Sequence, residues 1–186
     1  MTTATTNGIL DAARHVFEQY GVRRDNVEDV ARAAGVSRST LYRAYPNKDV
    51  LLEAVLLQQF DEFLTELDRV ASGLSPREAV VECFTQGMRL TREIPLLARL
   101  AETEPDLITA AGAASHSSLV LGSAERVAGT LRRAGATMPD DELRTVAELM
   151  LRVAWTYLLN PRGGLDVEDE KAVRDYARRY LAPLVS

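Results

Sequence analysis

The sequence predicts an all-α protein: a three-helix N-terminal head, a long fourth helix and a C-terminal helical body, with about nine or ten helices in all. Apolar residues recur at three- and four-residue steps in one segment after another, which is the period of a helix buried on one face. Glycine, serine, asparagine and proline stand between these segments, where they end one helix or begin the next.

The composition is that of an ordinary globular protein of 186 residues, with 46% hydrophobic and 26% charged residues. The single cysteine, Cys83, excludes an internal disulfide. The polar, uncharged opening MTTATTNG does not have the pattern of a secretory signal, and no uncharged apolar run is as long as a membrane span. We therefore expect a cytoplasmic protein with no membrane segment.

The first helix is predicted from about Asn7 to Tyr20, and Gly21 ends it. Its apolar residues share one face that backs the next two helices: Ile9, Ala13, Val16, Phe17 and Tyr20. His15 lies on this helix with no cysteine or second histidine nearby. Because metal sites need clustered ligands, we expect His15 to be a structural or surface residue.

Residues 27–48 have the pattern of a helix-turn-helix. The first helix of this motif is predicted to begin after Asn26, a good N-cap, with carboxylates at Glu28 and Asp29 in its first turn. Its apolar stripe comprises Val27, Val30, Ala31 and Ala34. Gly35 follows where the end of a helix needs a residue that adopts positive φ at little cost.

The second helix of the motif begins after Ser37, a natural N-cap, and is short because Pro46 disfavours helical geometry at Tyr45. Leu41 is expected to point into the core. A short helix after a tight glycine turn has the geometry to lie in a DNA major groove. Its polar face offers donors suited to phosphates or base edges: Arg38, Ser39, Thr40, Tyr42 and Arg43.

The run VARAAGVSRSTLYRAYPNKDVLL resembles the DNA-binding domain of TetR-family transcriptional regulators. In that family a Gly-Val-Ser turn leads into Thr-Leu-Tyr, then an aromatic residue, then a Lys at the start of a long fourth helix. The matching residues are Gly35, Val36, Ser37, Thr40, Leu41, Tyr42, Tyr45 and Lys48. Ala44 stands where the family often has His, and Asn26-Val27 replaces a frequent Thr pair. Both departures change the groups near phosphate, and neither disturbs the core pattern.

The resemblance implies a DNA-binding domain over residues 1–48 and an effector-binding and dimerisation domain over residues 49–186. The expected DNA contacts are Arg38, Ser39, Thr40, Tyr42, Arg43 and Lys48. The arginines are expected to recognise bases or phosphates, and the other side chains to anchor phosphates, with Ser39 able to do either. For Arg43 the alternative is an exposed solubilising charge, and for Tyr42 it is a role in sealing the core of the head.

Charge is distributed unevenly along the chain. Residues 1–48 hold seven Lys and Arg against five Asp and Glu, whereas residues 49–186 hold 15 against 22. A mildly basic head on an acidic body suits a protein that binds selected DNA, and the net charge of −5 argues against a general polyanion binder. Chance variation of surface charge is the alternative explanation.

The long fourth helix is predicted from its N-cap Asn47 to about Ala71, and it belongs to both halves of the protein. Ser75-Pro76-Arg77-Glu78 has the pattern of a capping box and opens a fifth helix. Further helices are predicted near 96–102 and 106–113, and over about 119–134, 139–159 and 167–182. His116 lies in a weakly patterned segment, and no acid or second base is placed to give it a catalytic role.

The resemblance implies that the last two helices pair with those of a second subunit in a four-helix bundle. The candidate interface residues are Val146, Met150, Ala154, Val173, Tyr176 and Tyr180. The alternative is that Trp155 and Tyr176 are simply core residues. We expect a homodimer, because one short recognition helix reads little DNA and a twofold dimer doubles the contact.

The resemblance also implies a pocket for a small-molecule effector between the fourth and eighth helices. The candidate lining residues are Phe60, Phe63, Phe84, Met88 and Leu97, and for each of them the alternative is ordinary core packing. No charge cluster with the pattern of a buried site marks the body, so we expect an apolar or amphipathic ligand. No cofactor and no metal are expected.

These patterns predict a sequence-specific DNA-binding regulator, in the first instance a homodimeric repressor of a palindromic operator that is released by its ligand. A corepressor-dependent regulator or an activator is one alternative. A ligand-binding helical protein with a non-functional DNA-binding head is another. An enzyme is not expected, because the sequence lacks a metal-spaced ligand set and a phosphate-binding glycine loop.

Overall fold

The computed structural model describes residues 3–22, 27–104, 106, 118–161 and 163–186. Within these residues the chain forms nine α-helices and no strand, which confirms the all-α prediction. The helices are α1 (Thr3–Tyr20), α2 (Val27–Ala33), α3 (Arg38–Ala44), α4 (Lys48–Ala71), α5 (Pro76–Glu93), α6 (Pro95–Thr103), α8 (Ser118–Arg133), α9 (Asp140–Leu159) and α10 (Glu170–Tyr176).

The chain divides into two compact units. The first comprises Met1–Asp61 and Pro95–Glu104, and the second comprises Glu62–Ile94 and Pro105–Ser186. Helix α4 is continuous across this division, so it contributes residues to both units. The predicted functional boundary after Lys48 stays a prediction.

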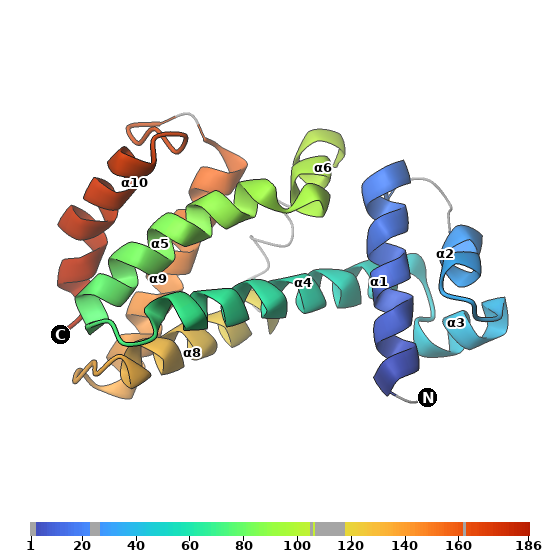
Figure 1. Ribbon diagram of the computed structural model, residues 1–186, viewed down its shortest axis with the longest axis horizontal. Coiled ribbons are helices and arrows are strands. Elements are labelled where there is room, and N and C mark those ends of the chain that lie inside the picture. The colour runs from blue at the N-terminus through green and yellow to red at the C-terminus, as the bar shows by residue number, and fades with distance from the viewer. Residues whose placement is uncertain (1–2, 23–26, 105, 107–117, 162) are drawn as a thin grey trace. The chain divides into compact units, whose positions relative to one another are not determined.

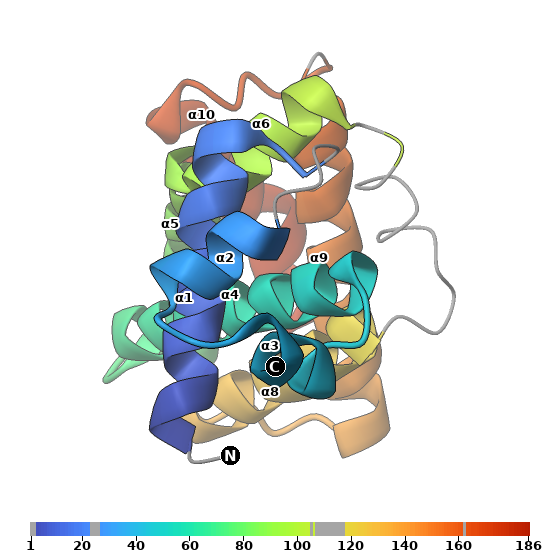
Figure 2. The same ribbon diagram turned by 90° about the vertical axis from the view of Figure 1, so that its right-hand side faces the viewer.

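Each of the first four helices contributes at least one fully buried side chain to the core of the first unit. Examples are Phe17 of α1, Val30 of α2, Leu41 of α3 and Leu51 of α4. Helix α2 packs on α1 and α3 packs on α2, as Figures 1 and 2 show. One side of α3 is therefore fixed by hydrophobic burial, which leaves its other side available to solvent.

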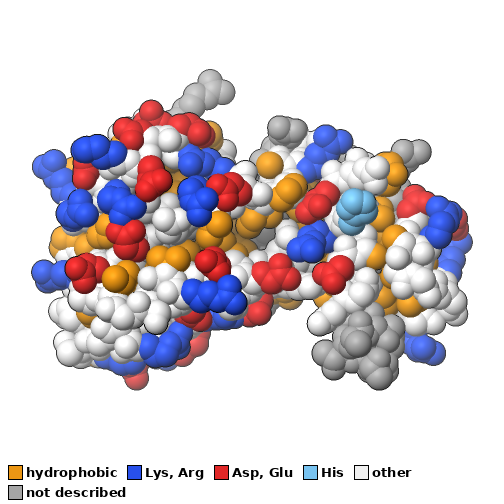
Figure 3. All heavy atoms as spheres, in the orientation of Figure 1, with side chains coloured by type: hydrophobic (Ala, Val, Ile, Leu, Met, Phe, Trp, Pro, Cys, Tyr) orange, Lys and Arg blue, Asp and Glu red, His pale blue; other side chains and the backbone are white. Residues whose placement is uncertain are grey.

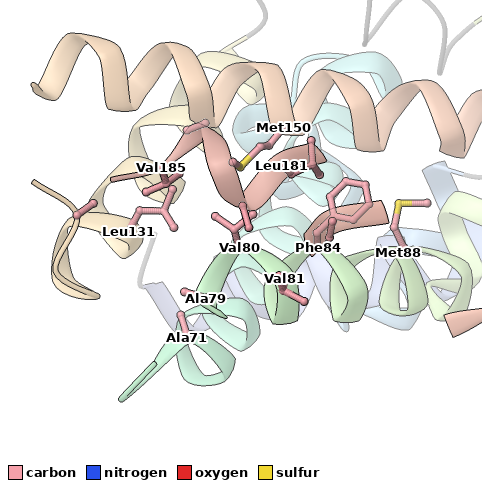
Figure 4. Packing of buried hydrophobic residues seen from close by; sticks show 14 of the residues in the cluster. Ala71, Ala79, Val80, Val81, Phe84, Met88, Leu131, Met150, Leu181 and Val185 are labelled. Carbon is pink, nitrogen blue, oxygen red and sulfur yellow. The ribbon is translucent and has the colours of Figure 1, made fainter. Parts of the chain in front are cut away.

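The core of the second unit is built around α5, which packs against α8, α9, α10 and the turns that follow α10. In Figure 4, Val80 and Phe84 of α5 point toward the layer that carries Met150 and Leu181. The predicted capping box is present, because the backbone N–H of Ser75 donates to the Glu78 carboxylate at 3.1 Å and the Ser75 hydroxyl also donates to it. These bonds lower the pKa of Glu78.

The C-terminal helix differs from its prediction. It begins at Glu170, after Asp169 caps it by accepting from the Lys171 N–H at 2.9 Å. Val167 is buried in the segment before the helix, and Arg92 donates to its carbonyl. The predicted start at residue 167 was three residues too early. Val167 is apolar and buried, as a residue of the helix would be, but it lies in the non-helical segment before α10. After Tyr176 the chain forms a π-helical turn, Ala177–Leu181, and a 3-10 turn, Ala182–Leu184.

Other predicted helix ends agree within a few residues, although α1 begins at Thr3 and not at Asn7. Three predictions fall outside the described residues: the N-cap Asn26, the helix from position 107 onward, and His116. Among the described residues, none of the helices combines the length and the apolar character that crossing a bilayer requires. Figure 3 shows charged side chains of both signs interspersed with hydrophobic ones over α5 and α10.

Candidate nucleic-acid interface

Helix α2 ends in a glycine turn that sets the direction of the chain toward α3. Gly35 has a φ of +64°, its N–H donates to the Arg32 carbonyl at 3.2 Å, and the Val36 N–H donates to the Ala31 carbonyl at 3.0 Å. These two bonds form a Schellman motif. Beyond its chain neighbours, nothing in the described part of the chain lies within 4 Å of a Cβ built at Gly35. The backbone angle alone therefore requires glycine.

Ser37 precedes α3 and caps it, as predicted. Its backbone is extended, and its hydroxyl oxygen accepts from the Thr40 N–H at 3.1 Å. The same oxygen lies 2.8 Å from the Thr40 hydroxyl and 2.9 Å from the Ser39 hydroxyl. Three hydroxyl groups therefore gather at the first turn of α3, where they form a connected set of donors and acceptors.

The inner side of α3 is apolar. Leu41 is fully buried, and Tyr45, which follows the helix, is buried beside it with its N–H donating to the Leu41 carbonyl at 2.8 Å. Burial raises the pKa of the Tyr45 phenol above its ordinary value. These two side chains fix the rotation of α3 about its axis, which determines the residues that face outward.

The outer side of α3 gathers most of the residues predicted to contact DNA. Arg38, Ser39, Tyr42 and Arg43 are exposed, and Thr40 is half-buried. The Tyr42 side chain has 36% of its surface exposed, so it contributes less to the core than Leu41 and Tyr45 do. The outer side thus presents guanidinium and hydroxyl groups together, which is the chemistry that phosphates and base edges bind.

Arg38 contacts two side chains at once. Its Nη1 donates to Oε1 of Glu28 on α2, and its Cζ lies 5.6 Å from the centroid of the Tyr42 ring. The second contact has the geometry of a cation–π interaction. Glu28 was not among the predicted site residues. The sequence analysis gave it only a place in the first turn of α2, because a pairing across ten residues has no periodic signal.

Lys48 is the first residue of α4 and is half-buried. Asn47 caps this helix as predicted, because its Oδ1 accepts from the Val50 N–H at 2.9 Å. Lys48 therefore follows α3 after one short connection, within the same unit. Its predicted contact with phosphate stays a prediction.

The predicted effector residues fall in both units. Phe60 and Leu97 belong to the first unit, in which Leu97 is buried. Phe63, Phe84 and Met88 belong to the second, and the latter two are buried in its core. Their contribution to a ligand pocket stays a prediction.

The predicted dimer residues differ in exposure. Met150 and Val173 are buried within the second unit, Val146, Ala154 and Tyr176 are half-buried, and Tyr180 is 53% exposed. Two residues that the sequence analysis did not select, Leu149 and Leu159 of α9, are exposed large hydrophobic residues. Ten residues of α-helix separate them by about 15 Å along the axis of α9 and by about 80° around it.

The described residues contain no group of three or more His, Cys, Asp or Glu side chains that could hold a metal ion. The outer side of α3, with its arginines and hydroxyls, is the feature of the first unit that best fits a ligand. The fold and this surface together define a helix-turn-helix protein.

Comparisons with known proteins show which family the N-terminal part of the chain resembles. Residues 9–55 match the family model for bacterial regulatory proteins of the tetR family. The HTH-type transcriptional regulator RutR of Escherichia coli (strain K12) is 33% identical over 98 residues, which are 53% of this chain and 46% of RutR. The alignment thus spans about half the length of that relative.

Two further similarities extend over the whole chain. The uncharacterized HTH-type transcriptional regulator Rv1255c of Mycobacterium tuberculosis is 28% identical over 190 residues, covering 100% of this chain and 87% of that protein. The TetR family repressor AlkX of Dietzia sp. has a similar fold, with a TM-score of 0.76, 22% identity, and coverage of 96% of this chain and 98% of AlkX. The N-terminal part of the chain is thus similar to the DNA-binding domain of tetR-family regulatory proteins, and the fold of the chain is similar to that of AlkX.

Proposed function

We propose that this protein is a sequence-specific DNA-binding transcriptional regulator, which acts as a homodimeric repressor of a palindromic operator and is released by an apolar or amphipathic ligand. The outer side of α3 carries this proposal. It presents two arginines, a tyrosine and two hydroxyl residues on a helix whose start and rotation are fixed by Ser37 and Leu41.

The side chains of α3 divide the work of recognition by their chemistry. A guanidinium reads the O6 and N7 atoms of guanine with two parallel hydrogen bonds, so Arg38 and Arg43 are assigned to bases or phosphates. Thr40, Tyr42 and Lys48 are assigned to phosphates, which fix the register of the helix on the duplex. Ser39 is assigned to either partner. No catalytic role is part of the proposal.

Two copies of α3 are needed for tight, selective binding, because one copy of this seven-residue helix contacts only a few base pairs. The second unit is proposed to supply the dimer contact through α9 and the C-terminal turns. These elements expose three large hydrophobic residues to solvent: Leu149, Leu159 and Tyr180. Exposed apolar groups of this size are typical of protein interaction sites. The candidate half-buried members of the dimer contact are Val146, Ala154 and Tyr176.

The ligand is proposed to act through the spacing between the two α3 helices of the dimer. Half-sites lie about 34–36 Å apart on DNA, so a small rotation of each head prevents simultaneous binding. Helix α4 is continuous and belongs to both units, which gives a route from a ligand to the head. Such a ligand must bind the two states of the dimer with different affinities.

Selection of duplexes from a random-sequence library tests the proposal. The control is a protein that carries both Arg38→Ala and Tyr42→Ala, whose α3 keeps its buried Leu41. We expect the native protein to enrich a palindromic motif and the control to enrich none. Enrichment of a single half-site would contradict the dimer, and equal enrichment by both proteins would contradict recognition by α3.

Titration of the selected duplex in the presence of candidate ligands tests the direction of the response. Release of DNA supports a ligand-released repressor, whereas tighter binding identifies a corepressor-dependent regulator or an activator. A native protein that enriches no sequence at low salt, with or without such ligands, would contradict DNA recognition and support a ligand-binding protein with a non-functional head.

A further inference from the structure

We propose that Glu28 is a positioning residue for sequence recognition, which holds the Arg38 guanidinium in the orientation that reads a base. This inference rests on the proposed function and deepens it. Glu28 lies on α2, outside the recognition helix, and reaches across the turn to accept a hydrogen bond from Arg38 Nη1. The ion pair therefore joins the two helices of the motif through their exposed side chains.

The pair stabilises the free protein only weakly. The Arg38 and Glu28 side chains have 61% and 64% of their surfaces exposed, and exposed ion pairs are screened by water and salt. The pair becomes more important when DNA covers it, because water is then displaced from around the charges. This difference favours a role in recognition over a role in folding.

The geometry restricts Arg38 from two directions. Glu28 holds one end of the guanidinium, and the Tyr42 ring lies 5.6 Å from Arg38 Cζ on the neighbouring turn of α3. Bidentate recognition of guanine needs two N–H groups in one fixed plane. A guanidinium has five donors, so an arginine can bind a carboxylate and a base together. An arginine that is already oriented loses less side-chain entropy when it binds.

The carboxylate of Glu28 also opposes binding that is independent of sequence. It reduces the net positive charge that phosphates encounter, and phosphate attraction supplies most of the non-specific affinity. Glu28 is therefore expected to act in two ways: it orients the arginine that reads a base, and its charge weakens phosphate attraction on all sequences alike.

Asp29 provides a matched control because it is next to Glu28 in the first turn of α2. Its carboxylate pairs with Arg32 of the same helix at 2.8 Å. Asp29→Ala thus removes the same charge from the same turn while leaving the contact between Glu28 and Arg38. Glu28→Gln is the conservative variant, since its amide oxygen can still accept from Arg38 Nη1 but carries no charge.

The experiment measures base preference at every position of the selected duplex for the native protein and for Glu28→Ala, Glu28→Gln, Asp29→Ala and Arg38→Ala. Circular dichroism melting of each variant verifies that the head is folded. We expect Arg38→Ala and Glu28→Ala to lose preference at the same base-pair position, by about tenfold. Glu28→Gln is expected to keep that preference. Asp29→Ala is expected to keep it as well, and to increase the non-specific affinity for DNA.

Three results would overturn the inference. If Glu28→Ala behaves like Asp29→Ala, the carboxylate acts by charge alone. If Arg38→Ala leaves the base preference unchanged, Arg38 contacts phosphate and there is no base reading to position. If Glu28→Gln loses the preference while remaining folded, the hydrogen bond is not what orients Arg38. None of these three results contradicts the proposed function as long as the native protein still selects a motif. A native protein without any sequence preference would contradict both the proposed function and the role of Glu28.

Discussion

The chain uses the same helix-ending turn in two regions with different results. After α8, Gly135 has a φ of +101°, its N–H donates to the Arg132 carbonyl, and the Ala136 N–H donates to the Leu131 carbonyl, each at 3.0 Å. This repeats the Schellman pattern of the turn at Gly35. Backbone geometry is therefore common to the two turns and cannot distinguish a DNA-reading motif from an ordinary helical hairpin.

The side chains after each glycine make the difference. After Gly135, Ala136 is buried, and Arg132 donates to the carbonyls of Ala136 and Met138 and to the Asp140 carboxylate. That guanidinium is used to close the turn. After Gly35, the cap residue Ser37 is exposed, and the arginines that follow it face outward. Arg132 is bonded within its own turn, whereas the arginines after Gly35 are exposed, where the proposed recognition of DNA requires them.

The largest expected effect comes from truncating the leucine that anchors the helix after each turn. Leu41 of α3 and Leu143 of α9 are each 1% exposed. Leu41→Ala and Leu143→Ala are each expected to lower the free energy of unfolding by about 2–5 kcal/mol, measured by denaturant titration. Leu41→Ala is also expected to abolish operator binding, because it releases α3 from its rotation. If Leu41→Ala bound the operator normally, the buried side of α3 would not orient its outer side.

The next effect concerns the two glycines. Gly35→Ala and Gly135→Ala each force a residue with a Cβ into positive φ, which costs about 1–2 kcal/mol of folding free energy. Thermal melting of each variant checks the cost, and Asn at the same position is expected to recover part of it. Only Gly35→Ala is expected to weaken operator binding. Equal loss of binding from both substitutions would contradict the separate roles of the two turns.

A smaller effect separates the caps of the two units. Ser37→Ala and Ser75→Ala each remove a helix cap, at a cost of about 1 kcal/mol measured by denaturant unfolding. Ser37→Ala is expected to weaken operator binding, whereas Ser75→Ala is expected to leave it unchanged. Ser37→Asp keeps a capping oxygen but adds a negative charge at the DNA surface, so it should remain folded and bind poorly. Normal binding by Ser37→Asp would show that DNA does not approach this turn.

The smallest effect at neutral pH belongs to Cys83 of α5. Burial, followed by the nearby carboxylates of Asp68 and Glu82, raises the pKa of its thiol from 9.0 to about 12. At pH 8 we expect iodoacetamide to modify the folded protein far more slowly than the protein in urea. Because the folded pKa is the higher one, this thiol contributes stability below pH 9, and the contribution is lost as the pH rises toward 12. Cys83→Ala should remove that pH dependence, and rapid labelling of the folded protein would contradict the burial.

The sequence was sufficient to predict features that depend on neighbouring residues. The positive φ at Gly35, the caps at Ser37 and Asn47, and the capping box at Ser75 each follow from residues within one helical turn. The resemblance to a known family selected residues that lie on the exposed side of α3, and their contact with DNA stays a prediction. These local features also predicted the boundaries of α2, α3 and α4 to within a residue or two.

Features that depend on distant contacts could not be predicted in the same way. The pairing of Glu28 with Arg38 depends on the angle between two helices, and the Val167 carbonyl before α10 accepts a hydrogen bond from Arg92 of α5, 75 residues away in the sequence. The core position of Val173 likewise comes from packing, since an apolar helical residue can face its own core or a second subunit. Periodicity identifies the apolar face of a helix and does not identify what covers it.

Fluorescence anisotropy with two duplexes checks the claim that the outer side of α3 recognises the DNA sequence. The selected operator and a scrambled duplex are titrated with the native protein, with Arg43→Ala, and with Arg69→Ala as the matched control. Arg69 lies in the second unit, 74% exposed and paired with Glu66. We predict that Arg43→Ala reduces the preference for the operator by about 5- to 150-fold, while Arg69→Ala leaves it unchanged. Equal preferences for all three proteins, or equal losses from both substitutions, would contradict the claim.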